Sequence, residues 1–234
     1  MDCVVTVCDE KRRFLDTLFH PPLCITIPNG ATDQRANGTT PAATSRPYCL
    51  FVGDASKGKG LHYLLQAVAK SRYAGSLTVK AAGHVTPEEQ RLLTRAHTDV
   101  DVQFLGLVAA EEMQELYVGS LFCTLPSMHE QCSYAAIEMM MHGKAVIATR
   151  TEGLREMFRD GENCLAVPVR LEQGIEPRLD TDVFAAHINT LMENPALRLA
   201  IGGRAREDYL ARYTAEAMAD AIQDLYHILW NDET

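Results

Sequence analysis

Short apolar or β-branched runs alternate with helical patterns of roughly ten to fifteen residues over most of this chain. The runs that we expect to be strands are residues 3–7, 24–27, 48–53, 76–81, 101–105, 121–125, 145–149 and 163–167. Helical patterns lie at residues 9–19, 59–71, 87–97, 110–119, 133–142 and 154–159. Strands that are separated by helices form βαβ units, which favour a parallel sheet with helices on its faces. The pattern therefore predicts an α/β fold, with a Rossmann-like parallel sheet flanked by helices.

Two parts of the chain depart from this alternation. From about residue 180 onward the sequence reads as helix only, which predicts a C-terminal helical tail. Residues 31–47 are rich in Thr, Ala, Asn, Gly and Pro, which is typical of a linker or a mobile loop. Residues 1–30 hold too few elements for a core of their own and look like the tail end of another domain. We expect a Rossmann-like domain at residues 48–212 and a closing helix at 213–234.

The charge balance and the cysteines restrict the possible partners and compartments. A formal net charge of −9 argues against an extended nucleic-acid surface, because phosphate backbones are bound by clustered Lys and Arg. This net charge is compatible with one small pocket that binds a diphosphate. The seven cysteines are scattered without a C-x-x-C pair, which favours a reducing compartment over a disulfide framework or a zinc site. Because the sequence shows neither a long apolar run nor a signal-peptide pattern, we expect a cytoplasmic protein.

A glycine-rich turn at residues 51–60 lies between a predicted strand and a predicted helix, with the sequence F-V-G-D-A-S-K-G-K-G. Such a turn presents free backbone N–H groups and the positive end of the helix dipole, which suits a phosphate, and Lys59 adds a positive charge. The spacing resembles a nucleoside-triphosphate P-loop, but Gly60 stands where that motif needs a Mg²⁺-binding hydroxyl. We therefore expect a phosphate site of another kind, with an ordinary strand-to-helix turn bearing a solvated lysine as the alternative.

A second candidate site follows the predicted strand at residues 121–125. Its sequence, L-P-S-M-H-E-Q-C-S-Y-A-A-I-E, places Glu130 in a loop and Glu138 about one and a half turns inside the next helix. Residues 131–133 would supply the unpaired N–H groups of the helix N-terminus, which again suit an anion. Burying an unpaired glutamate among apolar residues is costly, so Glu138 needs a partner such as a ligand with hydroxyl groups. The alternative is that Glu138 lies on the surface of the helix. The three methionines at 139–141 are better explained by core packing.

In this order and at this separation, the two sites resemble those of retaining glycosyltransferases of family 4, which have the double-Rossmann GT-B architecture. The family carries an F-V-G-R-x-x-x-x-K-G turn, a V-x-F-L-G-x-V segment, and a P-S-x-x-E motif with a second Glu further along. The matching positions here are Val52, Gly53, Lys59, Gly60, Ala82, Gly83, 102–108, Pro126, Ser127, Glu130, Glu138, Gly143, 145–149, Gly153, Leu154, Glu156 and 160–163. The resemblance covers roughly residues 48–230 and identifies the chain mainly with the C-terminal, nucleotide-sugar-binding half of such an enzyme.

The head of the chain resembles the end of the N-terminal domain of such an enzyme. Residues 6–19 match its last strand and helix, and residues 25–30, I-T-I-P-N-G, match the entry into the inter-domain linker. The resemblance thus implies that residues 1–30 are a remnant of the acceptor domain, and that the helix at 213–234 packs back toward them. On this interpretation the chain supplies the donor site and transfers sugar poorly or not at all by itself.

The resemblance also implies a role for each matching residue. Lys59 would neutralise the departing nucleoside diphosphate and Glu130 would bind hydroxyls of the donor sugar, so we expect these two to be catalytic. Glu138 would bind the ribose hydroxyls, the amides of residues 132–134 the distal phosphate, and the backbone at 105–107 the base. The expected donor-binding set is Gly53, Lys57, Lys59, Leu105, Gly106, Leu107, Glu130, Cys132, Ser133, Tyr134 and Glu138. No metal or other cofactor is expected, because lysine and helix amides supply the stabilising charge.

One position departs from the family pattern and keeps a second interpretation open. Asp54 stands where the family has Arg, and a carboxylate that faces a diphosphate at ~4 Å is repelled by roughly 1–4 kcal/mol. Either Asp54 points away from the diphosphate, or Lys57 compensates for its charge, or the donor site is weakened, and of these we expect Lys57 to compensate. The chain is then either the donor-binding part of a glycosyltransferase, or a non-catalytic sugar-nucleotide-binding or scaffolding subunit that pairs with a separate acceptor domain.

The resemblance implies a UDP-sugar or GDP-sugar as donor. It leaves open whether the acceptor is a glycan, a lipid, a small molecule or a peptide. Apolar residues of the first helix and of the last one would lie where another domain docks, so a homodimer or a partner acceptor domain is possible. No nucleic-acid partner is expected.

Overall fold

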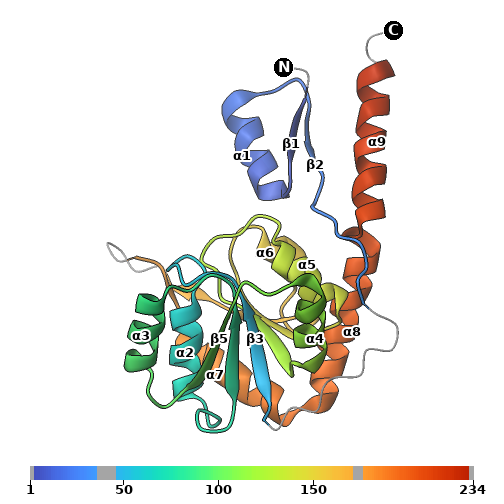
Figure 1. Ribbon diagram of the computed structural model, residues 1–234. Helices are drawn as coiled ribbons and strands as arrows, with labels where there is room; N and C mark the ends of the chain where they lie inside the picture. Colours follow the sequence, from blue (N-terminus) through green and yellow to red (C-terminus); the bar gives the residue numbers. More distant parts are fainter. Residues whose placement is uncertain (1–2, 36–45, 171–175, 232–234) are drawn as a thin grey trace.

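The computed structural model describes residues 3–35, 46–170 and 176–231 (Figure 1). Its centre is a six-stranded parallel sheet with the strand order β5-β4-β3-β6-β7-β8. These strands are β3 (Tyr48–Val52), β4 (Thr78–Ala82), β5 (Asp101–Gly106), β6 (Phe122–Leu125), β7 (Val146–Thr149) and β8 (Leu165–Val167). All six correspond to predicted strands, so the expected α/β fold with a parallel sheet is confirmed.

Helices cover both faces of this sheet, because its strands carry apolar side chains on both sides. Along β3, Cys49 and Phe51 belong to one buried apolar cluster, whereas Tyr48 and Leu50 belong to another. The helices of this domain are α2 (Leu61–Lys70), α3 (Pro87–Ala96), α4 (Ala110–Gly119), α5 (Tyr134–Met141), α6 (Leu154–Met157), α7 (Thr181–Glu193) and α8 (Pro195–Arg212). Helices α2 and α7 contribute to the first cluster, α4, α5 and α6 contribute to the second, and α8 contributes to both.

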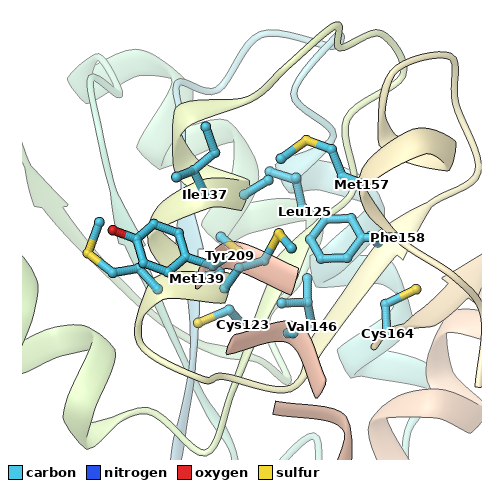
Figure 2. Close-up of a cluster of buried hydrophobic side chains, with 14 of the residues drawn as sticks. Cys123, Leu125, Ile137, Met139, Val146, Met157, Phe158, Cys164 and Tyr209 are labelled. Atoms are coloured by element: carbon cyan, nitrogen blue, oxygen red, sulfur yellow. The ribbon is translucent and has the colours of Figure 1, made fainter. Parts of the chain in front are cut away.

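The apolar cluster on the α5 face holds the helix that carries Glu138. Figure 2 shows Met139 of α5 among Leu125 of β6, Val146 of β7 and Tyr209 of α8. The methionines at 139–141 are all buried, so their predicted role in core packing is confirmed. This packing fixes α5 against the sheet, and with it the loop that leads from β6 into α5.

The N-terminal segment forms a small unit of its own beside the sheet domain. It consists of β1 (Val4–Thr6), α1 (Asp9–Phe19) and β2 (Cys24–Thr26), and the chain closes with α9 (Ala215–Asn231). Strands β1 and β2 pair in parallel but are not part of the six-stranded sheet. Helix α9 extends beyond the sheet domain in the direction of this unit (Figure 1). None of the described helices is both long and apolar enough to cross a membrane.

The N-terminal segment and α9 meet at one crossing point. Ala31 forms a parallel bridge with Thr214, and the Ala215 N–H donates to the Ala31 carbonyl at 3.0 Å. Most of the predicted linker at 31–47, namely residues 36–45, lies outside the described residues. The crossing therefore ties the start of the predicted linker to the start of the closing helix.

Two local features differ from the sequence-based expectation. Helix α2 begins at Leu61 rather than at residue 59, because Gly60 adopts a left-handed conformation with φ of 76° and precedes the helix as its N-cap. Strands β9 (Val169–Arg170) and β10 (Arg178–Leu179) form an antiparallel pair that was not predicted. Strands of two residues are too short to show an alternation of apolar and polar positions.

Candidate functional site

The order of strands in the sheet reverses at one point, and both sequence motifs lie there. From β3 the chain moves outward through β4 to β5, and β6 then returns to the opposite side of β3. In parallel α/β sheets, ligands bind in the crevice at the carboxyl ends of the strands where this reversal occurs. Residues 53–60 follow β3 and residues 126–133 follow β6. The two predicted sites therefore lie next to each other at the same edge of the sheet.

The two loops touch through their backbones. A Cβ atom on Gly60 would overlap the carbonyl oxygen of Pro126. Close by, the Met128 N–H donates to the Gly58 carbonyl at 2.7 Å. Glycine is needed at position 60 both for its left-handed conformation and for this close approach. The contact sets the position of the neighbouring Lys59 relative to the loop after β6.

The two predicted catalytic residues meet across this contact. Lys59 Nζ lies 2.6 Å from Glu130 Oε1, and the side chains are 36% and 12% exposed respectively. The Glu130 side chain is thus mostly enclosed by protein, whereas the Lys59 side chain is partly exposed to solvent. The Glu130 backbone is held as well, because its carbonyl accepts the Gly153 N–H at 3.0 Å. An ammonium group beside a carboxylate can bind an anionic group and a hydroxyl group at neighbouring positions.

The start of α5 forms another side of the site. Ser133 caps the helix, since its Oγ accepts the Ala136 N–H at 3.4 Å. Asn29 of the N-terminal segment donates from Nδ2 to the Cys132 carbonyl at 2.8 Å, which orients the peptide just before this cap. Tyr134, the first residue of α5, is 54% exposed. A helix leaves its first N–H groups without intrahelical acceptors, so those beyond the reach of the Ser133 cap are available to an anion.

Glu138 lies inside α5, and its partner is a tyrosine of α4. Tyr117 Oη donates to Glu138 Oε2 at 2.7 Å. Tyr117 is 1% exposed, and its ring stacks on that of His142 with 4.8 Å between the centroids. Burial and then the Glu138 charge raise the pKa of Tyr117 well above its ordinary value, so the hydroxyl keeps its proton and donates. The half-buried Glu138 thus has a protein partner where the sequence suggested a ligand or solvent.

Glycines line the carboxyl ends of β3, β4 and β5. The Gly53 N–H donates to a β4 carbonyl at 2.9 Å, and the Gly83 N–H donates to the Gly106 carbonyl at 2.8 Å. A Cβ atom on Gly83 would overlap the Gly53 carbonyl oxygen. Beyond them, Leu107 is 85% exposed, whereas Leu105 packs against the apolar cluster of the α5 face. This edge therefore exposes backbone, which lets a ligand approach closely.

Asp54 is held by its own turn. Its Oδ1 accepts the Ser56 N–H at 2.8 Å. Hydrogen bonds from Ser56 are the main cause that lowers the pKa of Asp54, and the charge of Lys59 lowers it further. The partner of Asp54 is thus the Ser56 N–H of its own turn, and Lys57 lines a groove beside the start of α2. An aspartate readily bonds the backbone two residues ahead, and that turn draws the carboxylate back onto the chain.

Tyr117 and Asn29 contribute to the site although neither was predicted to do so. Asn29 lies in the I-T-I-P-N-G segment, but its partner Cys132 is 103 positions away, so the segment alone could not reveal the contact. Tyr117 follows an ordinary helical pattern in which its ring counts as apolar. A buried hydroxyl needs a polar partner, and this requirement was the signal that could have pointed to a neighbouring acid.

Comparisons with known proteins agree with this arrangement. Residues 46–194 match the family described as Glycosyl transferases group 1. The lipopolysaccharide core biosynthesis glycosyltransferase LpsE of Rhizobium meliloti is 28% identical over 193 residues, which cover 82% of this chain and 52% of LpsE. An uncharacterized glycosyltransferase of Methanocaldococcus jannaschii is 24% identical over 181 residues, which cover 76% of this chain and 44% of the relative. The chain thus spans about half the length of the curated relatives it matches.

Solved structures share the fold. Sucrose-phosphate synthase of Thermosynechococcus elongatus superposes with a TM-score of 0.82 at 24% identity, over 99% of this chain and 59% of its own. HepE of Anabaena, in complex with UDP and glucose, gives a TM-score of 0.78 at 18% identity, over 97% of this chain and 63% of its own. The sheet domain has the predicted fold of one half of a GT-B glycosyltransferase. Since the family match also covers more than half of the residues, the chain belongs to the group 1 glycosyltransferases.

Proposed function

We propose that this chain provides the nucleotide-sugar donor site of a retaining glycosyltransferase of family 4. The observation that carries the proposal is the Lys59–Glu130 pair, which lies where the strand order reverses. This pair brings a cation and a hydrogen-bond acceptor to the place where parallel α/β sheets bind ligands. A nucleotide sugar needs both, because it carries a diphosphate next to a ring of hydroxyl groups.

In the proposed complex the diphosphate lies between Lys59 and the N-terminus of α5. The leaving nucleoside diphosphate gains negative charge as the glycosidic bond breaks, and Lys59 and the amides of residues 132–134 stabilise that charge. These groups are oriented before the donor arrives, so little reorganisation is needed during the reaction. Glu130 binds sugar hydroxyls, Glu138 binds ribose, and the glycine-lined edge near Gly106 receives the base. This assignment requires no metal ion.

Two solved relatives support a nucleotide sugar as donor. HepE of Anabaena has been determined in complex with UDP-glucose, and the pneumococcal O-GlcNAc transferase GtfA with UDP and GlcNAc. For this chain we propose a UDP-sugar or a GDP-sugar, bound in the cytoplasm, where the scattered cysteines stay reduced. The acceptor is a glycan, a lipid, a small molecule or a peptide.

We also propose a domain assignment along the chain. Residues 48–212 form the donor domain, 31–47 the linker, and 1–30 the end of an acceptor-binding domain toward which residues 213–234 pack back. The crossing of Ala31 with Thr214 supports this division, because it joins the linker to the closing helix. Transfer then needs further acceptor-binding parts, so the chain by itself binds donor and transfers little.

A non-catalytic sugar-nucleotide-binding or scaffolding subunit is the second candidate. The charge of Asp54 favours it, because a carboxylate in the phosphate-binding turn weakens the hold on a diphosphate. Incubation of the chain with the donor that it binds separates the two candidates. Slow release of free sugar from that donor supports the enzyme, whereas binding without any turnover supports the subunit.

Calorimetric titration with UDP, GDP and their sugars tests the donor site. Lys59→Ala should weaken binding of the preferred nucleoside diphosphate by roughly tenfold or more, because a charge-assisted contact to phosphate is lost. Lys70→Ala is the matched control, since Lys70 pairs with Asp182 at 2.7 Å near the other end of α2. It should bind like the unmodified chain. The proposed donor site would be contradicted if the unmodified chain bound none of these nucleotides.

A further inference from the structure

Tyr117 lies at the C-terminal end of α4, in a part of the helix that is firmly anchored. Lys144 Nζ donates to the carbonyl oxygens of Val118 and Ser120 at 3.0 Å and 2.8 Å. The aromatic ring of Tyr117 is buried in the apolar cluster of the α5 face and is stacked on His142. The tyrosine hydroxyl therefore occupies a fixed position next to α5.

Glu138 uses one of its carboxylate oxygens to bind this hydroxyl. Tyr117 Oη donates to Oε2 at 2.7 Å, and no other described group hydrogen-bonds the Glu138 carboxylate. Its Oε1 is therefore left to accept a hydrogen bond from a ligand. Glu138 is half-buried, on a helix whose remaining residues largely pack into the core.

We propose that Tyr117 is a positioning residue that makes the site discriminate against nucleotides that lack the ribose hydroxyl bound by Glu138. It holds Glu138 so that Oε1 faces the sugar of the nucleoside. This inference rests on the proposed function, because it assumes that Glu138 binds the ribose of the donor. Tyr117 itself touches no substrate and acts through Glu138.

The physical reason is preorganisation. A glutamate side chain loses rotamer freedom when a ligand fixes it, and that loss weakens binding. The buried hydroxyl of Tyr117 has already fixed the carboxylate, so a ribose hydroxyl meets an oriented acceptor. A nucleotide that lacks the hydroxyl bound by Oε1 gains nothing from this orientation. The ratio of the two affinities therefore reports on the orientation of Glu138 and not on general stability.

The test is calorimetric titration of the full chain with the nucleoside diphosphate that it binds and with the 2′-deoxy and 3′-deoxy forms of that nucleotide. We expect the unmodified chain to bind at least one deoxy form on the order of tenfold more weakly. Tyr117→Phe should weaken binding of the ribonucleotide and leave binding of that deoxy form unchanged to within about twofold. The affinity ratio then falls close to one.

Tyr48→Phe is the matched control. Tyr48 is also a buried tyrosine, and its hydroxyl donates to the backbone carbonyl of Leu116, the neighbour of Tyr117, at 2.8 Å. The variant loses a comparable buried hydrogen bond to the same helix, α4, but keeps the contact between Tyr117 and Glu138. It should keep the affinity ratio of the unmodified chain, even where its melting temperature falls.

A double-mutant cycle completes the test. Glu138→Ala should also bring the ratio close to one, and adding Tyr117→Phe to it should cause no further loss. The inference would be overturned if Tyr117→Phe left the ratio of ribonucleotide to deoxynucleotide affinity unchanged. It would also be overturned if the affinity losses of the two single variants simply added in the double variant. In both cases the proposed donor site would stand. Equal affinity of the unmodified chain for the nucleoside diphosphate and both of its deoxy forms would also overturn the inference. Failure to bind any nucleoside diphosphate is a different result, because it removes the proposed function itself.

Discussion

At the scale of single residues, Asp54 carries the charge that is least favourable for the phosphate site proposed in the turn after β3. Its carboxylate accepts the Ser56 N–H and so helps to build the turn. The charge of Lys59 acts on this carboxylate and lowers the pKa of Asp54. Asp54 thus combines a structural hydrogen bond with an electrostatic cost to anion binding, and the two effects can be separated by substitution.

Asp54→Asn separates them, because asparagine keeps a side-chain oxygen for the Ser56 N–H and removes the charge. The affinity for a nucleoside diphosphate should rise by roughly two- to fivefold at low ionic strength, since one repulsive charge is lost. The gain should shrink as salt is added, because screening weakens the repulsion that the substitution removes. Calorimetric titration at two salt concentrations measures both effects. An affinity that does not change at low salt would place Asp54 outside the field of the phosphate.

The residues of the site differ in how well the sequence predicted them. Lys59 and Glu130 were predicted from motifs, and the sheet brings them into contact because β3 and β6 are neighbours. The hydrogen bond between Asp54 and Ser56 was not predicted, because motif spacing does not show how a local turn holds a side chain. The contact of Tyr117 with Glu138 joins two helices, and sequence periodicity carries no information on such pairs.

At the scale of elements, the packing of α4 against α5 buries a titratable ring. His142 follows the last residue of α5, is buried, and stacks on Tyr117. Burial is the main cause that lowers its pKa to about 4, and the charge of Lys144 acts in the same direction. The other charged groups that act on it are Arg35, Asp33 and Arg206. His142 is therefore neutral in the folded chain near pH 7.

This burial predicts that the chain loses stability in mild acid. The unfolded state takes up a proton on His142 near pH 6.5 and the folded state only near pH 4, so stability falls as the pH drops from 6.5 toward 4. Between pH 7.5 and pH 5 this one group contributes a loss of about 2 kcal/mol. His142→Phe keeps the stacking and removes the titration.

Urea unfolding at the two pH values measures the effect. The unmodified chain should lose about 2 kcal/mol more than the His142→Phe chain between pH 7.5 and pH 5. His227→Phe on the exposed face of α9 is the control and should lose as much as the unmodified chain. Equal losses in all three proteins would contradict the lowered pKa of His142.

The elements themselves were mostly predictable. Apolar runs marked the strands of the sheet, and helical spacing marked the longer helices. The start of α2 was missed because Gly60 adopts a left-handed conformation that the amphipathic pattern does not reveal. Strand order was not predicted from the residues, since periodicity shows which segments are strands but not which strands pair.

At the scale of the whole molecule, Glu156 joins the N-terminal unit to the sheet domain. Its Oε2 accepts the Asp9 N–H and its Oε1 accepts the Glu10 N–H, both at 2.8 Å. A side chain of α6 thus caps the N-terminus of α1, where the helix dipole favours a negative charge. Ion pairs of Arg155 with Glu10 at 2.9 Å and of Lys11 with Glu152 at 3.4 Å lie beside this cap.

Glu156→Ala should loosen α1 and leave the sheet domain intact. Loss of the cap costs about 1–2 kcal/mol of local stability, which corresponds to roughly five- to thirtyfold faster hydrogen exchange in α1. Hydrogen exchange followed by mass spectrometry measures α1 and the β3–β6 strands separately. Glu162→Ala is the control, because Glu162 pairs with Arg159 at 2.7 Å on the exposed surface. Equal protection of α1 in both variants would contradict the capping role.

The contact between Gly60 and Pro126 has a consequence for exchanging parts between relatives. One loop is shaped to the backbone of the other, so neither can change its course without displacing its neighbour. A graft that transplants the turn after β3 without the loop after β6 creates a clash or a gap at this crossing. The two loops therefore form a single transplantable unit, and a chimera with a relative has to exchange them together.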